Sequence, residues 1–184
     1  MRHALHLAAL GLCFSLSAHA GGFSLASPDI EPGKAIANKY VFNGFGCAGD
    51  NVSPAVVWQD APKDTKSFAL TVYDPDAPTG SGWWHWLMIN IPADMHGLQQ
   101  GAGDPAAGKV PKGVVQTRTD FGKHGWGGPC PPKGDRPHRY IFTVHALKVD
   151  KLDVPEDATA ALVGFMINAN RIGKASFTGY YGRK

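Results

Sequence analysis

The sequence has few cysteines, no large excess of either charge and no hydrophobic run long enough to cross a membrane. Its 184 residues include 18 basic and 15 acidic side chains, which give a formal net charge of +3. This balance predicts no basic surface of the kind that nucleic acids bind, so we expect no nucleic-acid partner. The longest apolar run, from Leu5 to Leu16, is shorter than the ~20 residues of a membrane-spanning helix, and the protein is not expected to span a membrane.

The first twenty residues have the pattern of a secretory signal peptide. Arg2 gives a basic start, the apolar run follows, and cleavage is predicted after the small residue Ala20. A lipoprotein anchor at Cys13 is the alternative, although this cysteine lies inside the apolar run and follows Leu12 rather than a small residue. We therefore expect a periplasmic or secreted protein in which residues 21–184 form a single domain.

Removal of the signal peptide takes Cys13 away and leaves Cys47 and Cys130. In an oxidising compartment an even pair favours a disulfide over a zinc site, because zinc usually takes four protein ligands or three with a water. Two free buried thiols are the alternative. A bridge would close a loop of more than eighty residues and would stabilise the fold by ~4 kcal/mol through the loop-closure entropy of the unfolded chain.

Strand patterns dominate the mature chain, as alternating or continuously apolar segments. The predicted strands are residues 23–25, 39–42, 67–73, 84–91, 139–149 and 175–181. The three long strands are expected to form the centre of the sheet, and the strand at 84–91 is expected to be buried on both faces. In the last strand, Phe177 is expected to face inward.

One helix is predicted late in the chain, after Pro155. An apolar stripe at helical spacing is expected to cover the sheet and consists of Ala158, Leu162, Phe165, Met166 and Ala169. The strands outnumber the helices, so the expected fold class is β-rich with a few peripheral helices.

Two loops are rich in turn-forming residues. The first, 43–54, contains Asn51, which is expected to bond the backbone of its own loop. The second, 101–113, consists largely of Gly, Ala and Pro. These small residues offer little apolar surface to bury, so we expect the loop to be exposed.

Polar segments interrupt the apolar strands at two places, with DPDAP at 74–78 and GGPCPPKGDRPHRY at 127–140. Both lie at strand ends, where a rigid scaffold can present a small-ligand pocket. Asp74 and Asp76 leave the first long strand, whereas His85 and His138 begin the next two. These four side chains can therefore approach one another across neighbouring strands. For Asp76 the alternative is a purely structural role in bonding the turn amides.

The sequence motifs of common catalysts are missing. There is no GxSxG elbow and no HExxH pair, and neither remaining cysteine is expected to be a free nucleophile. No histidines have the helical spacing of a metal site. We therefore expect a binding protein with no catalytic residues, metal or cofactor. A hydrolase that uses a histidine as general base is the weakest alternative.

The polar segments resemble the signature blocks of the phosphatidylethanolamine-binding proteins, also called Raf-kinase-inhibitor-like proteins. DPDAP, the pair His85–Trp86, and GGPCPPKGDRPHRY running into IFTVHAL occur in the family's order and spacing. NVSPAVVW at 51–58 is similar to the family's upstream block, and the resemblance covers 23–184. The cysteines resemble those of an exported bacterial subgroup, which supports a disulfide between Cys47 and Cys130.

The resemblance implies a large central, mostly antiparallel sheet packed with a smaller sheet and a few peripheral helices. It also implies a small cavity near the strand ends that accepts phosphate or phosphoethanolamine-like anions. The residues that would line it are Asp74, Pro78, Trp83, His85, Gly128, Pro129, His138 and Tyr140. A small anionic or phosphorylated ligand is thus the expected partner, and a protein partner and a homodimer are further expectations. Since some relatives inhibit proteases, an enzyme inhibitor acting through surface loops is the alternative function.

Overall fold

The computed structural model describes residues 22–155 and 157–184. The predicted signal peptide and Cys13 lie outside these described residues. Within the described ranges, no helix is long and apolar enough to span a bilayer.

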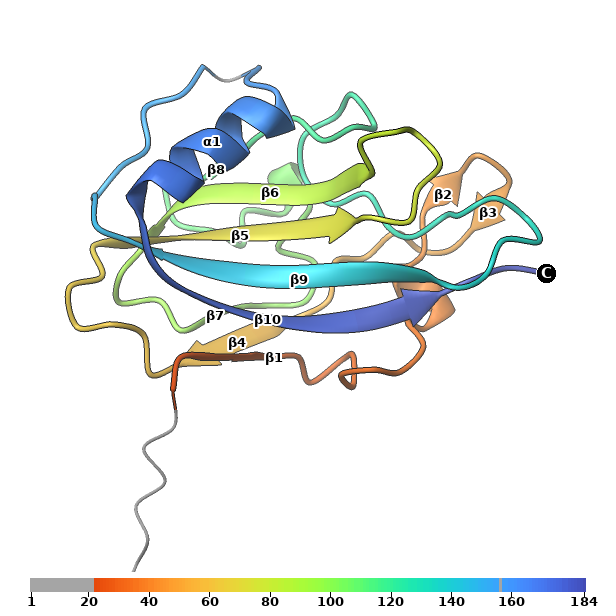
Figure 1. The fold of residues 1–184 in the computed structure, drawn as a ribbon, viewed down its shortest axis with the longest axis horizontal. Coiled ribbons are helices and arrows are strands. Elements are labelled where there is room, and N and C mark those ends of the chain that lie inside the picture. The colour runs from red at the N-terminus through yellow and green to blue at the C-terminus, as the bar shows by residue number, and fades with distance from the viewer. Residues whose placement is uncertain (1–21, 156) are drawn as a thin grey trace, which may run out of the picture.

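A five-stranded antiparallel sheet forms the centre of the domain (Figure 1), with the strand order β10-β9-β5-β6-β8. Its central strands are β5 (Ser67–Asp74), β6 (Trp83–Pro92) and β9 (His138–Leu147). Their positions confirm the three predicted long strands. Most residues of β5 and β6 are buried on both faces of the sheet. These apolar strands therefore form the middle layer of the fold.

The edges of this sheet are the short strand β8 (Val115–Gln116) and the long strand β10 (Arg171–Tyr181). β10 begins before residue 175, where it was predicted, because its pairing with β9 continues across a bulge between Arg171 and Gly173. Phe177 is buried, as predicted, and stacks on Phe142 at a centroid distance of 4.8 Å.

Two smaller sheets complete the β structure. The first has the order β1-β4-β7 and consists of Ser24–Ala26, Val56–Gln59 and Gly97–Leu98. Its buried side chains, which include Trp58, pack on the large sheet to form the main core. The second is the hairpin of β2 (Asn43–Gly44) and β3 (Cys47–Ala48), which lies beyond the strand ends of the large sheet (Figure 1). The smaller packed sheet agrees with the expected architecture.

The strand predicted at 39–42 is wrong. Residues Asn38–Tyr40 form a 3-10 turn, η1, in which the Val41 N–H donates to the Asn38 carbonyl at 3.0 Å. Tyr40 and Val41 are both buried although they are consecutive. In a strand, consecutive side chains point to opposite faces, so a strand here would not bury both residues on one side. A tight turn allows both to be buried.

Helix α1 (Ala160–Asn170) covers the other face of the large sheet (Figure 1). It begins at its N-cap Thr159, whose hydroxyl accepts from the Leu162 N–H at 3.3 Å. The buried residues of the helix are Ala160, Val163 and Ile167. The predicted stripe was therefore wrong in phase, because Phe165 is 68% exposed and Leu162 is 40% exposed. The helix is apolar on all sides, so its composition alone could not select the face that packs.

The loop 101–113 is less exposed than predicted at its start. Ala102 is buried, and the Gly103 N–H donates to the Ser53 hydroxyl at 2.8 Å. A Cβ atom at Gly103 would lie only 2.5 Å from the Trp126 Cβ, so this glycine permits close packing. Further along, Pro105–Ala107 form the exposed 3-10 turn η2.

Candidate ligand-binding site

A cavity of about 220 Å³ opens where the end of β5 meets the starts of β6 and β9. Because β5 is antiparallel to both neighbours, Asp74 pairs with Trp83 and lies near the first residues of β9. The cavity is lined by Phe45, Asp74, Ala77, Pro78, Thr79, Trp83, His85, Phe121, Cys130, Pro131, Pro132, His138 and Tyr140. The structure thus brings together six of the eight residues named from the sequence, all but Gly128 and Pro129.

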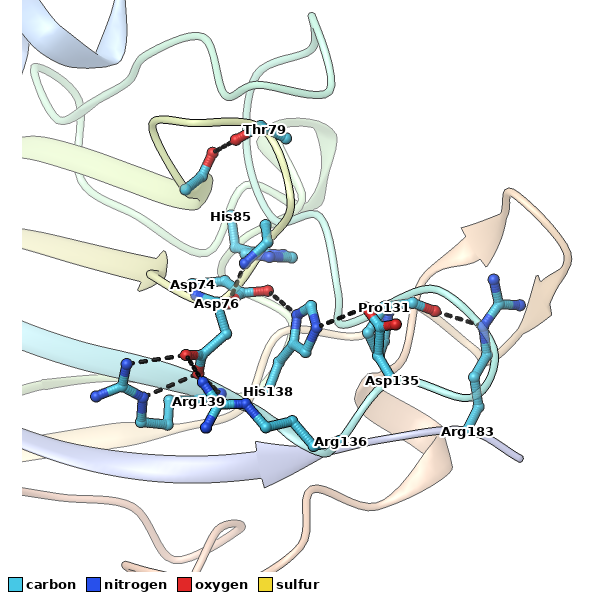
Figure 2. A network of polar contacts seen from close by, with 12 residues as sticks. Asp74, Asp76, Thr79, His85, Pro131, Asp135, Arg136, His138, Arg139 and Arg183 are labelled. Carbon is cyan, nitrogen blue, oxygen red and sulfur yellow. Dashed lines mark hydrogen bonds and ion pairs between the residues drawn. The ribbon is translucent and has the colours of Figure 1, made fainter.

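Asp74 is a buried carboxylate with both oxygens engaged (Figure 2). Its Oδ1 accepts from the N–H groups of Asp76 and Ala77 at 2.8 and 3.1 Å. Its Oδ2 accepts from His138 Nδ1 at 2.8 Å. Asp74 therefore fixes the DPDAP turn and connects it to β9. Asp74, and not Asp76, therefore accepts from the amides of this turn. The structural role of Asp76 lies in other contacts.

His138 lies between two carboxylates. Its Nδ1 faces Asp74, and its Nε2 is 3.3 Å from Oδ2 of Asp135 on the preceding loop (Figure 2). Both nitrogens can donate to these oxygens only when the ring is doubly protonated. Both ring nitrogens face carboxylate oxygens, so neither remains for a ligand.

Asp76 points away from the cavity and binds Arg139. Its carboxylate accepts from the Arg139 backbone N–H at 3.0 Å and from the guanidinium at 2.9 Å, and Arg136 adds a contact at 3.1 Å (Figure 2). The Asp76 side chain is only 6% exposed. Hydrogen bonds from Arg139 hold the pKa of Asp76 well below its usual range. The expectation that both aspartates meet the two histidines is therefore wrong for Asp76, which anchors the start of β9.

His85 is a buried, neutral histidine in the cavity wall. Its Nδ1 donates to the Gly127 carbonyl at 2.6 Å, and since a carbonyl only accepts, Nδ1 carries the hydrogen. Burial lowers the pKa of His85 to about 4, against the opposing effect of the Gly127 bond. Nε2 makes no hydrogen bond to the described part of the chain. It is therefore the ring atom left to accept from a ligand.

Two further polar atoms in this region are buried and unpaired. The Tyr140 hydroxyl and the Trp83 Nε1 have no hydrogen-bond partner among the described residues, and both side chains line the cavity. Burial raises the pKa of Tyr140, so the phenol keeps its proton at physiological pH. A buried donor without an acceptor is costly, which makes both groups candidates to bind a ligand oxygen.

Gly128 and Pro129 lie behind the lining rather than in it. The Gly128 N–H donates to Asn51 Oδ1 at 2.8 Å, and the Pro129 carbonyl accepts from the Phe42 N–H at 3.1 Å. A Cβ on Gly128 would lie 2.1 Å from the Tyr40 carbonyl oxygen, which only glycine avoids. Asn51 thus bonds a distant loop rather than its own, contrary to the expectation.

The predicted disulfide is present, since Cys47 of the β2–β3 hairpin is bonded to Cys130 in the cavity wall. The hairpin brings to the cavity an aromatic residue that the sequence reasoning missed, Phe45. Phe121, on a separate loop, was also missed. The position of Phe45 between two glycines and two residues before Cys47 was the available signal, whereas nothing in the local sequence marked Phe121.

Within 22–155 and 157–184, no three His, Cys, Asp or Glu side chains gather in a way that could hold a metal ion. The cavity instead combines a neutral imidazole, a phenol and an indole N–H with apolar walls. This set suits a small ligand that carries acceptor oxygens.

Comparison with known proteins gives consistent matches over most of the chain. The sequence pattern of the family described as phosphatidylethanolamine-binding protein matches residues 26–182. Among curated proteins, YbcL of Escherichia coli is 52% identical over 91% of both chains, and YbhB of the same organism is 52% identical over 85% of this chain and 98% of its own. The crystal structure of YbcL, a new member of the mammalian PEBP family, covers 89% of this chain and all of its own with a TM-score of 0.87. The homologue CT736 of Chlamydia trachomatis is 30% identical, covers 89% of this chain and 99% of its own, and has a TM-score of 0.74.

Proposed function

This chain belongs to the phosphatidylethanolamine-binding protein family, and we propose that its cavity binds a small anionic group such as a phosphate monoester, without chemical turnover. The observation that carries the proposal is that two buried donors on residues lining one cavity, the Tyr140 hydroxyl and the Trp83 indole N–H, have no partner in the described part of the chain. Oxygen atoms of a bound ligand would satisfy both donors.

The protonation state of His85 refines the choice of ligand. At neutral pH its Nε2 is an acceptor, which suits a phosphate monoester that keeps one P–OH hydrogen. A fully deprotonated ester would instead require His85 to take up a proton on binding, and Nε2 would then donate. Either route favours tighter binding as the pH falls toward the second pKa of the ester.

The surroundings of the cavity support a charged but small ligand. Asp74 accepts three hydrogen bonds and lies against His138, so most of its acceptor capacity is already used within the protein. A volume of about 220 Å³ is below the ~300–1,000 Å³ of drug-sized pockets. It matches a headgroup or a small ester rather than a whole lipid.

We further propose that the protein works outside the cytoplasm. The signal-peptide pattern of residues 1–20 and the Cys47–Cys130 disulfide support this proposal. Structural disulfides persist in oxidising compartments and are rare in the cytosol.

The test is a calorimetric titration of the oxidised mature protein with phosphate and phosphoethanolamine, on the wild type and on Tyr140→Phe. We expect saturable binding by the wild type and about a tenfold loss in the variant, because a hydrogen bond to a charged group is lost. Tyr73→Phe is the matched control, since the Tyr73 hydroxyl donates to the Ser81 carbonyl at 2.8 Å and does not line the cavity. Absence of binding by the folded wild type would refute the proposal. Equal affinities of the wild type and Tyr140→Phe would refute the role given to the phenol.

A further inference from the structure

We propose that Phe45 is a specificity residue at the mouth of the cavity, where it contacts an apolar group attached to the anion. This inference rests on the function proposed above and adds the class of ligand, a phosphate ester of an aryl alcohol. It is carried by the exposure, the backbone conformation and the tethering of Phe45.

Phe45 is the most exposed large apolar side chain of the described residues, at 70%, and yet it lines the cavity. Its φ of 51° lies in the left-handed region of backbone conformation, which residues other than Asn, Asp and Gly seldom occupy. Glycines stand on both sides of it, at 44 and 46. A phenylalanine with a strained backbone and an exposed ring contributes little to the stability of the fold. Residues with strained backbones concentrate at ligand-binding sites.

The hairpin that carries Phe45 is tied to the cavity wall at two points. Cys47 is bonded to Cys130, which lines the cavity. Arg183 donates to the carbonyls of Phe45 at 3.3 Å and Gly46 at 2.9 Å, and its Nε donates to the carbonyl of Pro131 in the same wall at 2.5 Å (Figure 2). These links hold the hairpin, and Phe45 with it, against the cavity wall instead of leaving it on a free loop.

Phe45 also continues an aromatic surface that begins inside the cavity. Its ring lies 6.0 Å from that of Phe121, and Phe121 meets Trp83 and His85 edge-on at 5.3 and 5.4 Å. In the proposed binding mode, His85 and Tyr140 form the polar end of the cavity and the aromatic rings around Phe45 form its apolar mouth. Inorganic phosphate would use only the polar end, whereas an ester with an apolar substituent would use both.

The experiment compares phenyl phosphate with methyl phosphate, two monoesters that differ in the size of the apolar group. Affinities are measured by calorimetry on the oxidised wild type, Phe45→Ala, Phe45→Tyr and Phe165→Ala. Phe165, on the outer side of α1, is 68% exposed and does not line the cavity, so it controls for the loss of an exposed phenyl ring. Thermal unfolding of each variant confirms that it is folded.

We expect the wild type to prefer phenyl phosphate over methyl phosphate by roughly tenfold, the size of one aromatic contact. Phe45→Ala should abolish most of this preference, Phe45→Tyr should keep it, and Phe165→Ala should leave the ratio unchanged. If the wild type binds both esters equally, or if Phe45→Ala keeps the preference, this inference is wrong while the anion site stands. If the folded wild type binds neither ester, the proposed function fails and this inference fails with it.

Discussion

His138 Nδ1 lies 2.8 Å from Oδ2 of Asp74, and both side chains are almost completely buried. This contact joins the last residue of β5 to the first residue of β9. The other oxygen of Asp74 holds two amides of the DPDAP turn. One carboxylate thus sets the relative positions of three parts of the cavity wall, and its loss should affect stability as well as binding.

Asp74→Asn should lower the free energy of unfolding by about 2 kcal/mol. The amide keeps the shape of the side chain but carries no charge, so its bonds to the turn amides and to His138 are no longer charge-assisted. Urea unfolding at pH 7 measures the effect. Asp135→Asn is the control, because Asp135 is 40% exposed and its loss should cost less than about 1 kcal/mol. Equal losses in the two variants would contradict the central role of Asp74.

Acid should destabilise the protein below about pH 6.5, because two buried histidines are neutral in the folded state. Burial lowers the pKa of His85 to about 4 and that of His145 to about 3, from an ordinary value of 6.5. As the pH falls below 6.5 the unfolded chain binds protons that the folded chain does not bind. Stability is therefore full above pH 6.5 and is lost progressively until the folded-state values are reached.

His145→Gln isolates one of these two contributions. The His145 Nε2 lies 3.0 Å from the Thr71 hydroxyl, a contact that a glutamine amide can replace without titrating. Between pH 7 and pH 4 the variant should lose about 3 kcal/mol less unfolding free energy than the wild type. Denaturant unfolding at the two pH values measures the difference. An unchanged pH dependence would show that His145 is not held neutral by burial.

Removal of the disulfide should weaken the fold without changing its architecture. Cys47 and Cys130 are 83 residues apart, and opening a loop of this length costs ~4 kcal/mol in the unfolded-chain model. The double variant Cys47→Ser, Cys130→Ser should unfold at a correspondingly lower urea concentration. Reductant should shift the wild type to the same midpoint and leave the variant unchanged. A wild type with the same midpoint in reductant and in oxidant would contradict this prediction.

Tyr140→Phe should leave stability unchanged or raise it by about 1 kcal/mol, although it weakens ligand binding. The Tyr140 hydroxyl is buried with no partner in the described part of the chain. Its burial without a hydrogen bond costs free energy, and the variant no longer has this cost. Thermal unfolding without ligand measures this. A marked loss of stability would mean that the hydroxyl has a structural partner and is not reserved for a ligand.

Where local periodicity decided the conformation, the sequence was sufficient for prediction. The three central strands follow from continuous or alternating apolar residues, and the disulfide follows from the single pair of cysteines that remains after the predicted signal peptide. Local pattern failed at α1, where apolar residues occur on every side, and at 39–42, where two consecutive residues are buried. In both places the packing partners selected the conformation, and they come from distant parts of the chain.

The cavity shows the same division. The residue types at 74–78, 83–85 and 138–140 were sufficient to indicate a polar site at the ends of neighbouring strands, since antiparallel pairing brings such ends together. Only the folded chain decided which atoms remain free. Asp76 binds Arg139, and both nitrogens of His138 face carboxylates. His85 Nε2 and the Tyr140 hydroxyl have no partner among the described residues. Hydrogen-bond partners, burial and the approach of Phe45 depend on contacts between segments up to 138 residues apart. Composition and spacing can indicate such contacts, but only three-dimensional packing specifies them.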